Sequence, residues 1–263
     1  MINAMNKATL KTQPHSGKKN SENPEKENRP RVTVKHAFLN YSGQKLLDDV
    51  SLEVYANQII AVVGPSGTGK TVLIKIIAGL IELDSGEIQL SSDSIGVAFQ
   101  NGALFTSMTV YENLIFVLEQ TLKKSVPDMD QRIDEVLNLV GISKDERDKY
   151  PSELSGGMQK RVSIARALVI YPDIMLYDDP SSGLDPMLAN KLEKDLKKFN
   201  QQHQMASIVV TNELSAIKNL ADRVIMLYQG KIVYEGSNDD FFTTKNPFAL
   251  QYTTHRETGL LER

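Results

Sequence analysis

The sequence predicts an α/β fold built on buried parallel strands, and three short apolar runs carry that prediction. Ile59–Val63 and Ser207–Val210 have the length and composition of strands that are buried on both faces. Ile174–Asp178 is a similar run that ends in a carboxylate, at the edge where sheets of this kind bind ligands. Stretches with apolar residues at helical spacing, such as Val72–Leu80, alternate with these runs. The 263 residues are enough for one large α/β domain or two small ones.

A glycine-rich loop between Ile59–Val63 and the helix that follows is the strongest functional signal. It fits the pattern G-x-x-x-x-G-K-[ST], whose backbone N–H groups surround phosphates, whose lysine reaches the β/γ oxygens and whose hydroxyl contacts Mg²⁺. A helix that begins at Lys70 adds the positive end of its dipole to the same anion site. A plain glycine-rich turn is the alternative, and the strand before the loop and the helix after it favour nucleotide binding. The loop consists of Gly64, Pro65, Ser66, Gly67, Thr68, Gly69, Lys70 and Thr71.

Composition excludes several classes of protein. The formal net charge of −3 argues against a nucleic-acid-binding protein, which normally carries a basic excess. The lack of cysteine excludes disulfides, thiolate metal sites and a cysteine nucleophile, and it fits a reducing compartment. No apolar run approaches the ~20 residues of a membrane span, because Val72–Ile81 contains Lys75. Since a signal-peptide pattern is also missing, we expect any membrane role to come through a partner.

The two ends of the chain differ from its centre. Residues 1 to about 30 are polar and nearly free of large apolar side chains, so they cannot bury enough surface to offset their ordering entropy. We expect a disordered tail there. A transit peptide is the alternative, since the first part is basic and free of acids, but it has no arginine and no clear amphipathic face. The ordered domain is expected over residues 31–236, and residues 237–263 are expected to form a C-terminal tail.

Local patterns predict the other elements. Asn57 suits a turn between strands because asparagine tolerates left-handed backbone. Thr109 and Glu112 form a capping box, which predicts a helix that runs to about Leu122. The other expected helices carry Ile133 to Val140, Met158 to Val169 and Leu188 to Phe199 on their apolar faces. The other expected strands are Arg31–Tyr41, Val50–Tyr55, Glu87–Leu90, Ile95–Phe99, Val224–Tyr228 and Lys231–Tyr234.

Two further segments have features of ligand sites. Ser155 is a candidate N-cap, and Gly156 and Gly157 behind it would expose N–H groups to an anion. The residues alone also allow a capped helix with two glycines and no ligand. Asp178 stands at the carboxyl end of a buried strand, where ligands bind, and solvated turn acids are the alternative for Asp178 and Asp179.

In their order along the chain, these motifs resemble those of the ABC ATPases over about Arg31 to Gly236. Leu154–Gly157 is similar to the signature motif of that family, and Ile174–Asp178 is similar to its Walker B motif. Ser182–Asp185 resembles the D-loop, which lies at the dimer interface in the family. The resemblance implies a mainly parallel core sheet, an antiparallel β edge and a helical subdomain at about residues 101–168. It also implies ATP hydrolysis with Mg²⁺.

The resemblance implies roles for single residues. Tyr41 would stack on adenine, although a core aromatic is nearly as plausible at that strand position. Gln100 matches the Q-loop glutamine, which contacts Mg²⁺ and senses the membrane partner, and Asp178 would hold Mg²⁺ through water. The implied catalytic residues are Asp179, Asn212 and Gln100. The implied metal-binding residues are Thr71, Gln100 and Asp178. The implied ATP-binding residues are Tyr41, Gly64 to Thr71, Ser155, Gly156, Gly157 and Asp185.

One stretch narrows the resemblance further. Phe99–Asn113 looks like the corresponding part of the Mla-type ATPases, which power phospholipid transporters that contain MCE proteins, and Leu154–Met158 fits the same subfamily. The implied partners are a second copy of this chain in a head-to-tail dimer, a membrane permease and an MCE-type lipid-binding protein, with no nucleic acid. The implied location is the cytoplasmic face of the inner membrane, peripheral through the permease, with the chloroplast stroma as the alternative.

Several residues depart from the family pattern. Asp179 stands where glutamate is usual, so its carboxylate is withdrawn by roughly 1 to 1.5 Å, and geometry governs a general base before its pKa does. Asn212 stands where histidine is usual and cannot titrate near neutrality. Met158 replaces the commoner glutamine, and the stretch Gly86–Gln100 is short, which predicts a trimmed antiparallel edge. Asp179 and Asn212 keep open the alternative of a degenerate nucleotide-binding regulator with little hydrolysis. A non-transport ABC ATPase is a second alternative, which is disfavoured because that class usually has tandem ATPase domains or a long coiled-coil insertion.

Overall fold

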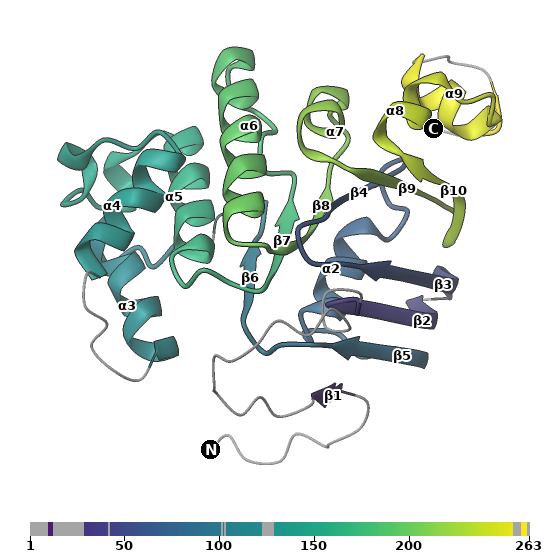
Figure 1. Ribbon diagram of the computed structural model, residues 1–263, viewed down its shortest axis with the longest axis horizontal. Coiled ribbons are helices and arrows are strands. Elements are labelled where there is room, and N and C mark those ends of the chain that lie inside the picture. The colour runs from purple at the N-terminus through teal and green to yellow at the C-terminus, as the bar shows by residue number, and fades with distance from the viewer. Residues whose placement is uncertain are drawn as a thin grey trace.

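The computed structural model describes residues 10–12, 29–41, 43–100, 102, 104–122, 129–254 and 259–261. Within these ranges the chain forms two β-sheets with helices packed around them, as Figure 1 shows. The larger sheet has the strand order β10-β9-β4-β8-β7-β6 and the smaller sheet has the order β1-β5-β2-β3. The predicted α/β class, with a mainly parallel core sheet and an antiparallel part, is therefore confirmed.

The parallel core of the larger sheet brings four loops to one edge. β4 (Ile59–Val63), β7 (Ile174–Asp178) and β8 (Ala206–Val210) are buried along their whole length, as the apolar runs predicted. β4 pairs in parallel with β8 and β9, and β7 pairs in parallel with β8 and β6. The remaining strands are β6 (Ile95–Ala98), β9 (Arg223–Tyr228) and β10 (Lys231–Ser237), and β10 runs antiparallel to β9. Because the strands are parallel, the loops after β4, β6, β7 and β8 leave from the same edge.

The smaller sheet packs against the larger one through helix α2 (Lys70–Ile77). Its strands β2 (Val32–Tyr41), β3 (Gln44–Val54) and β5 (Ser85–Leu90) are antiparallel. The apolar face of α2 shares one core cluster with residues of both sheets, so the helix that follows the glycine-rich loop is held on two sides. Asn57 adopts φ 62°, as predicted for the turn before β4.

Part of the segment expected to be a disordered tail is paired with this sheet. Leu10–Thr12 forms the short strand β1, which runs parallel to β5. The edge of β5 offers unpaired backbone groups that such a short strand can satisfy, and the disordered tail stays a prediction. Residues 1–9 and 13–28, including the stretch compared with a transit peptide, lie outside the described residues.

We expect deletion of residues 1–28 to shift the melting temperature by no more than about 2 °C. The described part of this segment adds only the three-residue strand β1, which pairs with one edge of one sheet. The measurement is thermal unfolding of the full chain and of the shortened chain, followed by circular dichroism. A decrease of about 5 °C or more would contradict the expectation and would mean that the segment packs on the domain.

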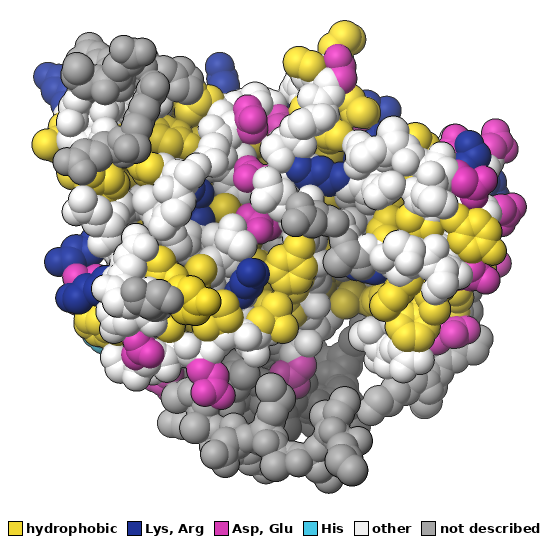
Figure 2. Space-filling model, turned by 180° about the vertical axis from the view of Figure 1, so that it is seen from behind, with side chains coloured by type: hydrophobic (Ala, Val, Ile, Leu, Met, Phe, Trp, Pro, Cys, Tyr) yellow, Lys and Arg dark blue, Asp and Glu magenta, His cyan; other side chains and the backbone are white. Residues whose placement is uncertain are grey.

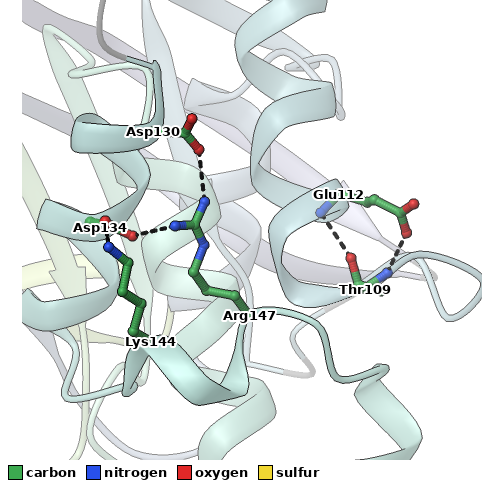
Figure 3. A network of polar contacts seen from close by, with 6 residues as sticks. All are labelled: Thr109, Glu112, Asp130, Asp134, Lys144 and Arg147. Atoms are coloured by element: carbon green, nitrogen blue, oxygen red, sulfur yellow. Dashed lines mark hydrogen bonds and ion pairs between the residues drawn. The ribbon is translucent and has the colours of Figure 1, made fainter.

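A group of helices follows β6. It consists of α3 (Val110–Leu122), α4 (Met129–Leu139) and α5 (Gly156–Leu168), with the short 3₁₀ helices η1 (Lys144–Glu146) and η2 (Pro151–Glu153). The predicted capping box is present, since the Thr109 N–H donates to Glu112 Oε2 at 2.8 Å and the Glu112 N–H donates to Thr109 Oγ1 at 3.2 Å (Figure 3). Arg147 donates to Asp130 and Asp134 of α4, at 2.8 Å each, and so fixes the loop after α4 against that helix (Figure 3).

The last part of the chain is folded rather than a tail. After α6 (Pro186–Gln202) and α7 (Leu214–Leu220), residues past 236 complete β10 and form α8 (Asn238–Thr243) and α9 (Pro247–Thr253). Ser237 caps α8, and Asn246, which proline follows, caps α9. Ala249 and Phe241 are fully buried in a cluster that includes residues of β4 and β9. The side chain of Gln251 also exchanges two hydrogen bonds with the backbone of Leu261, at 2.8 and 3.1 Å.

Candidate nucleotide-binding and catalytic site

Two positions of the loop after β4 must be glycine, because backbone atoms of neighbouring strands lie too close to leave room for a side chain. Gly64 has φ 143°, and a Cβ atom there would lie 2.1 Å from the carbonyl oxygen of Leu227 at the end of β9. Gly69 has φ 91°, and a Cβ atom there would lie 2.7 Å from the carbonyl oxygen of Leu46 in β3. Both positions therefore exclude side chains. The loop is held between the two sheets, and its N–H groups lie at the N-terminus of α2, where an anion is favoured.

Lys70 is a buried cation in this loop. Its side chain is only 7% exposed, and the ammonium donates to the carbonyl oxygens of Gly64 at 2.6 Å and Pro65 at 2.8 Å. Burial lowers the pKa of Lys70, while the negative charges of Asp179 and Asp178 oppose that shift. Phosphate oxygens are stronger acceptors for an ammonium than neutral carbonyls, so a phosphate chain is a suitable partner for this side chain.

Thr71 and Asp178 form a pair that suits a divalent cation. The Thr71 hydroxyl donates to Asp178 Oδ1 at 3.1 Å, and Asp178 is 4% exposed. Burial raises the pKa of Asp178, the hydrogen bond from Thr71 opposes that shift, and the charge of Asp179 adds to it. Among the described residues, no group of three or more His, Cys, Asp or Glu side chains could hold a metal alone. One carboxylate and one hydroxyl fit Mg²⁺, which takes its other ligands from phosphates and water.

Asp179 is the next residue, and it combines a strained backbone with a carboxylate oxygen that lacks a hydrogen-bond partner within the described chain. Its backbone lies in the left-handed region at φ 51°, fixed by a hydrogen bond of 2.8 Å from its N–H to the carbonyl oxygen of Val210. Oδ1 of its carboxylate is buried and has no hydrogen-bond partner within the described chain. A buried carboxylate oxygen without a donor is costly, and backbone strain of this kind is concentrated at functional sites. The oxygen is therefore a candidate acceptor for a proton or for a hydrogen bond from a water molecule.

The other catalytic candidates lie on neighbouring loops of the same edge. Gln100 is exposed in the turn after β6, and Asn212 is exposed after β8. The neighbour of Asn212 is fixed, since Thr211 is buried and its Oγ1 accepts a hydrogen bond of 3.0 Å from the N–H of Glu213. The sheet thus brings the loops of Gln100, Asp178 and Asn212 to one edge, and the catalytic roles of Gln100 and Asn212 stay predictions.

Tyr41 is exposed on the surface rather than packed in the core. It lies at the end of β2 and is 69% exposed, so the alternative of a core aromatic is wrong. Adenine stacking stays a prediction. A hollow beside the loop is lined by the loop residues Pro65 to Thr68 and by Gln44, Lys45, Tyr228, Gln229 and Gly230. The sequence did not indicate the last five, which come from the start of β3 and from the turn between β9 and β10.

The segment Ser155–Gly157 forms a separate surface at the start of α5. Ser155 is exposed, and its Oγ caps the helix by accepting a hydrogen bond of 3.3 Å from the N–H of Met158, as predicted. Asp185 also serves as a helix cap, because its Oδ1 accepts hydrogen bonds from Met187 and Leu188 at the start of α6. Helix capping accounts for a serine at position 155 and an aspartate at position 185. Contact with ATP stays a prediction for both segments.

We expect Asp178→Asn to stabilise the nucleotide-free protein by about 2 °C or more near pH 7.5 and to remove the further stabilisation by Mg²⁺ and ATP. The folded-state pKa of Asp178 lies above its ordinary value of 3.8, so folding disfavours the ionised carboxyl. The cost is present above the raised pKa and vanishes as the pH falls below the ordinary value. Thermal unfolding at about pH 7.5 and pH 4, with and without Mg²⁺ and ATP, measures both effects. A destabilised variant at the higher pH would contradict the expectation.

The fold and the site define a nucleotide-binding protein with a phosphate-binding loop and a neighbouring carboxylate pair. A family model described as "ABC transporter" matches residues 47–182. The chain is 34% identical to the protein TRIGALACTOSYLDIACYLGLYCEROL 3, chloroplastic, of Arabidopsis thaliana, over 85% of this chain and 73% of that protein. It is also 34% identical to a probable ribonucleotide transport ATP-binding protein mkl of Mycobacterium leprae, over 87% of this chain and 70% of that protein. The chain belongs to the ABC transporter family, as an ATP-binding subunit with ATPase activity.

Solved structures agree with this assignment. The ATP-binding cassette MJ0796, solved as a dimer bound to ADP and Pi, superposes with a TM-score of 0.73 at 28% identity, over 79% of this chain and 98% of that chain. CbiO1 of Clostridium perfringens, described as part of the transporter complex cbiONQ, superposes with a TM-score of 0.71 at 26% identity, over 83% of this chain and 93% of that chain. The resemblance expected from the motifs is therefore confirmed at the level of the family.

Proposed function

We propose that this chain is the ATPase subunit of a phospholipid transporter and that it works as a head-to-tail dimer on a membrane permease. The observation that carries the lipid assignment is the 34% identity, over 85% of this chain, to a plant protein that is named after a galactolipid. The stretch Phe99–Asn113, which resembles the Mla-type ATPases, supports the same assignment. Of the described helices, none is both long and apolar enough to cross a bilayer. The proposed location is the cytoplasmic face of the inner membrane, where the permease would hold the chain.

The proposed catalytic cycle assigns a role to each site residue. Lys70 and the N-terminus of α2 bind the phosphates, and Thr71 with Asp178 would hold Mg²⁺, which neutralises charge on the phosphate oxygens when bound. Oδ1 of Asp179 accepts a proton from the attacking water and orients it, and the amide of Asn212 donates a hydrogen bond to the γ-phosphate. Ser155–Gly157 of the second copy covers the phosphates and excludes water. The dimeric state of MJ0796 supports this pairing.

A surface beside the Gln100 loop suits the permease, and we name it the α3 surface. Phe105 is 42% exposed, with its ring edge-on to Phe116 at 5.2 Å. Next to the start of α3, a hollow is lined by Tyr111, Lys144, Arg147 and Asp148. Arg147 is fixed over the Tyr111 ring at 4.6 Å and held by two carboxylates of α4 (Figure 3). An exposed apolar side chain before α3 and a rigid polar hollow at the start of α3 would suit a short cytoplasmic helix of the permease.

Charge supports a protein partner rather than a nucleic acid. On the face drawn in Figure 2, lysine and arginine side chains alternate with acidic ones and are not gathered into one basic field. The net charge of the chain is −3. Nucleic-acid binding would require a basic patch to replace phosphate counterions. An MCE-type lipid-binding protein completes the proposed complex through the permease.

The test is purification of the tagged chain from its native membranes, followed by identification of the proteins and lipids that come with it. We expect a permease, an MCE-type protein and bound phospholipid. Phe105→Glu should release the permease because it places a charge at this exposed apolar position, whereas Phe242→Glu, at a similarly exposed phenylalanine on α8, should not. Recovery of a permease with a solute-binding protein for sulfate or a nucleotide, and without phospholipid, would contradict the lipid assignment.

A further inference from the structure

One lysine of α5 connects the Ser155–Gly157 segment to the residue that carries the catalytic carboxylate. The Lys160 ammonium donates to the carbonyl oxygen of Ser182 at 2.8 Å and to its Oγ at 2.6 Å. The Ser182 hydroxyl in turn donates to the backbone carbonyl oxygen of Asp179 at 3.2 Å. α5 is therefore connected to the turn that leads from β7 towards α6, and the connection runs through three hydrogen bonds.

The position of Lys160 makes these bonds strong. The side chain is partly withdrawn from water, and burial lowers the pKa of its ammonium, while the charges of Asp179 and Asp178 favour the cation. A partly buried ammonium needs its hydrogen bonds, and short bonds from a charged donor are stronger than neutral ones. Lys160 of α5 thus helps to fix the turn at Ser182, beside the hydrogen bonds that the turn makes within itself.

The same turn holds Asp179 in its strained conformation. A non-glycine residue at φ 51° persists only when its surroundings determine it. The N–H of Asp179 is fixed to Val210, and its carbonyl is fixed to Ser182 and through it to Lys160. The N–H of Ser182 also donates to this carbonyl, at 3.4 Å. Loss of the Lys160 contact would leave the carbonyl of Asp179 held by Ser182 alone, which would loosen the turn and with it the orientation of Oδ1.

We propose that Lys160 is a positioning residue that couples Ser155–Gly157 to the Asp179 carboxylate of the same subunit. This inference rests on the proposed function, in which Ser155–Gly157 contacts ATP held by the partner copy. A movement of α5 that closes this contact pulls on Ser182 through Lys160 and sets the direction of the Asp179 carboxylate. Hydrolysis at one site therefore responds to the nucleotide at the other, because one helix touches the partner's ATP and the turn beside its own site.

The test compares Lys160→Met, which keeps the aliphatic stem, with Lys160→Arg, which keeps a charged donor. We expect Lys160→Met to lower kcat about tenfold or more, because a small misplacement of a catalytic group has effects of that size. The Kd for ATP should change less than about twofold, since Lys160 does not touch the phosphate-binding loop. Lys160→Arg should recover part of kcat. Lys194→Met, at an exposed lysine on α6, is the matched control and should leave kcat unchanged.

Two further measurements separate coupling from a general structural role. Ser182→Ala removes the hydroxyl that links Lys160 to the carbonyl of Asp179. The double variant of Ser182→Ala and Lys160→Met should lose less activity than the product of the two single losses, as expected for residues in one network. Hydrogen exchange should be faster in peptides that cover residues 180–186 in Lys160→Met than in the wild type, with unchanged exchange around Lys70. An unchanged kcat in Lys160→Met, or unchanged exchange in residues 180–186, would overturn the proposal.

The exchange measurement also separates this inference from the proposed function. It needs neither a permease nor hydrolysis, so it tests the Lys160–Ser182 connection in the nucleotide-free protein. If the wild type fails to dimerise with ATP while the exchange difference persists, the proposed dimer is wrong and the connection is real. If the wild type dimerises and hydrolyses ATP and the exchange difference is missing, the connection is wrong.

Discussion

Lys70→Ala is expected to weaken ATP binding at least about tenfold. Lys70 is 7% exposed, and its ammonium donates to two loop carbonyls and is influenced by the charges of Asp179 and Asp178, so its bonds to phosphate would form away from bulk water. Hydrogen bonds to charged groups contribute about 1.5–3 kcal/mol each, and each 1.4 kcal/mol is a factor of about ten in affinity. Isothermal calorimetry with ATP and Mg²⁺ measures the change.

Two controls make this result specific. Lys218→Ala, at an exposed lysine on α7, should leave the Kd for ATP within about twofold of the wild type. Thermal unfolding shows whether Lys70→Ala is folded, because the variant leaves the carbonyls of Gly64 and Pro65 without their donor. A folded Lys70→Ala variant with wild-type affinity would refute the assignment of this loop to phosphate binding.

The second large effect concerns Asp179. We expect Asp179→Asn to lower hydrolysis about 10²-fold or more, to the background rate, because the variant loses the group that accepts the proton. ATP binding and ATP-driven dimerisation should remain, since the amide removes a charge near the phosphates and keeps the side-chain size. Phosphate release, measured with the permease present, and size-exclusion chromatography with ATP test the two expectations. A rate equal to the wild type would mean that Asp179 is not the base.

Asp179→Glu has two opposing effects. The longer side chain brings the carboxylate roughly 1 to 1.5 Å nearer to the attacking water, which raises the rate. The backbone at φ 51°, however, favours aspartate and asparagine over longer residues, so the variant should be slightly less stable. We expect a faster rate with a lower melting temperature. If the wild type and both variants release phosphate only at the background rate, the chain binds ATP without hydrolysing it.

The sequence was informative where the chemistry is local. The glycine-rich loop, the buried parallel strands and the caps of Thr109 and Ser155 could be predicted, because each depends on residues that are adjacent in the chain. The strand β1 and the helices after residue 236 were not predicted. A three-residue strand depends on a distant sheet edge, and helices of six and seven residues are too short to show a clear apolar periodicity.

Contacts between distant segments could not be predicted. The bond between Lys160 and Ser182 joins residues 22 positions apart, and no periodicity indicates it. The unsatisfied Oδ1 of Asp179 and the exposure of Tyr41 likewise depend on how the two sheets pack. Each of these features is set by the tertiary structure, so the sequence alone could not indicate it.

The hydrogen bonds that Lys70 makes with its own loop have a kinetic consequence. Because the ammonium already donates to two carbonyl oxygens, at 2.6 and 2.8 Å, a phosphate chain must replace these acceptors rather than approach a free cation. Association then includes a step in which the side chain turns, and its rate constant falls below the range set by diffusion and orientation alone. The binding enthalpy of ATP should also be less favourable than the number of new hydrogen bonds suggests, because the two hydrogen bonds of Lys70 to the loop are broken as the bonds to phosphate form.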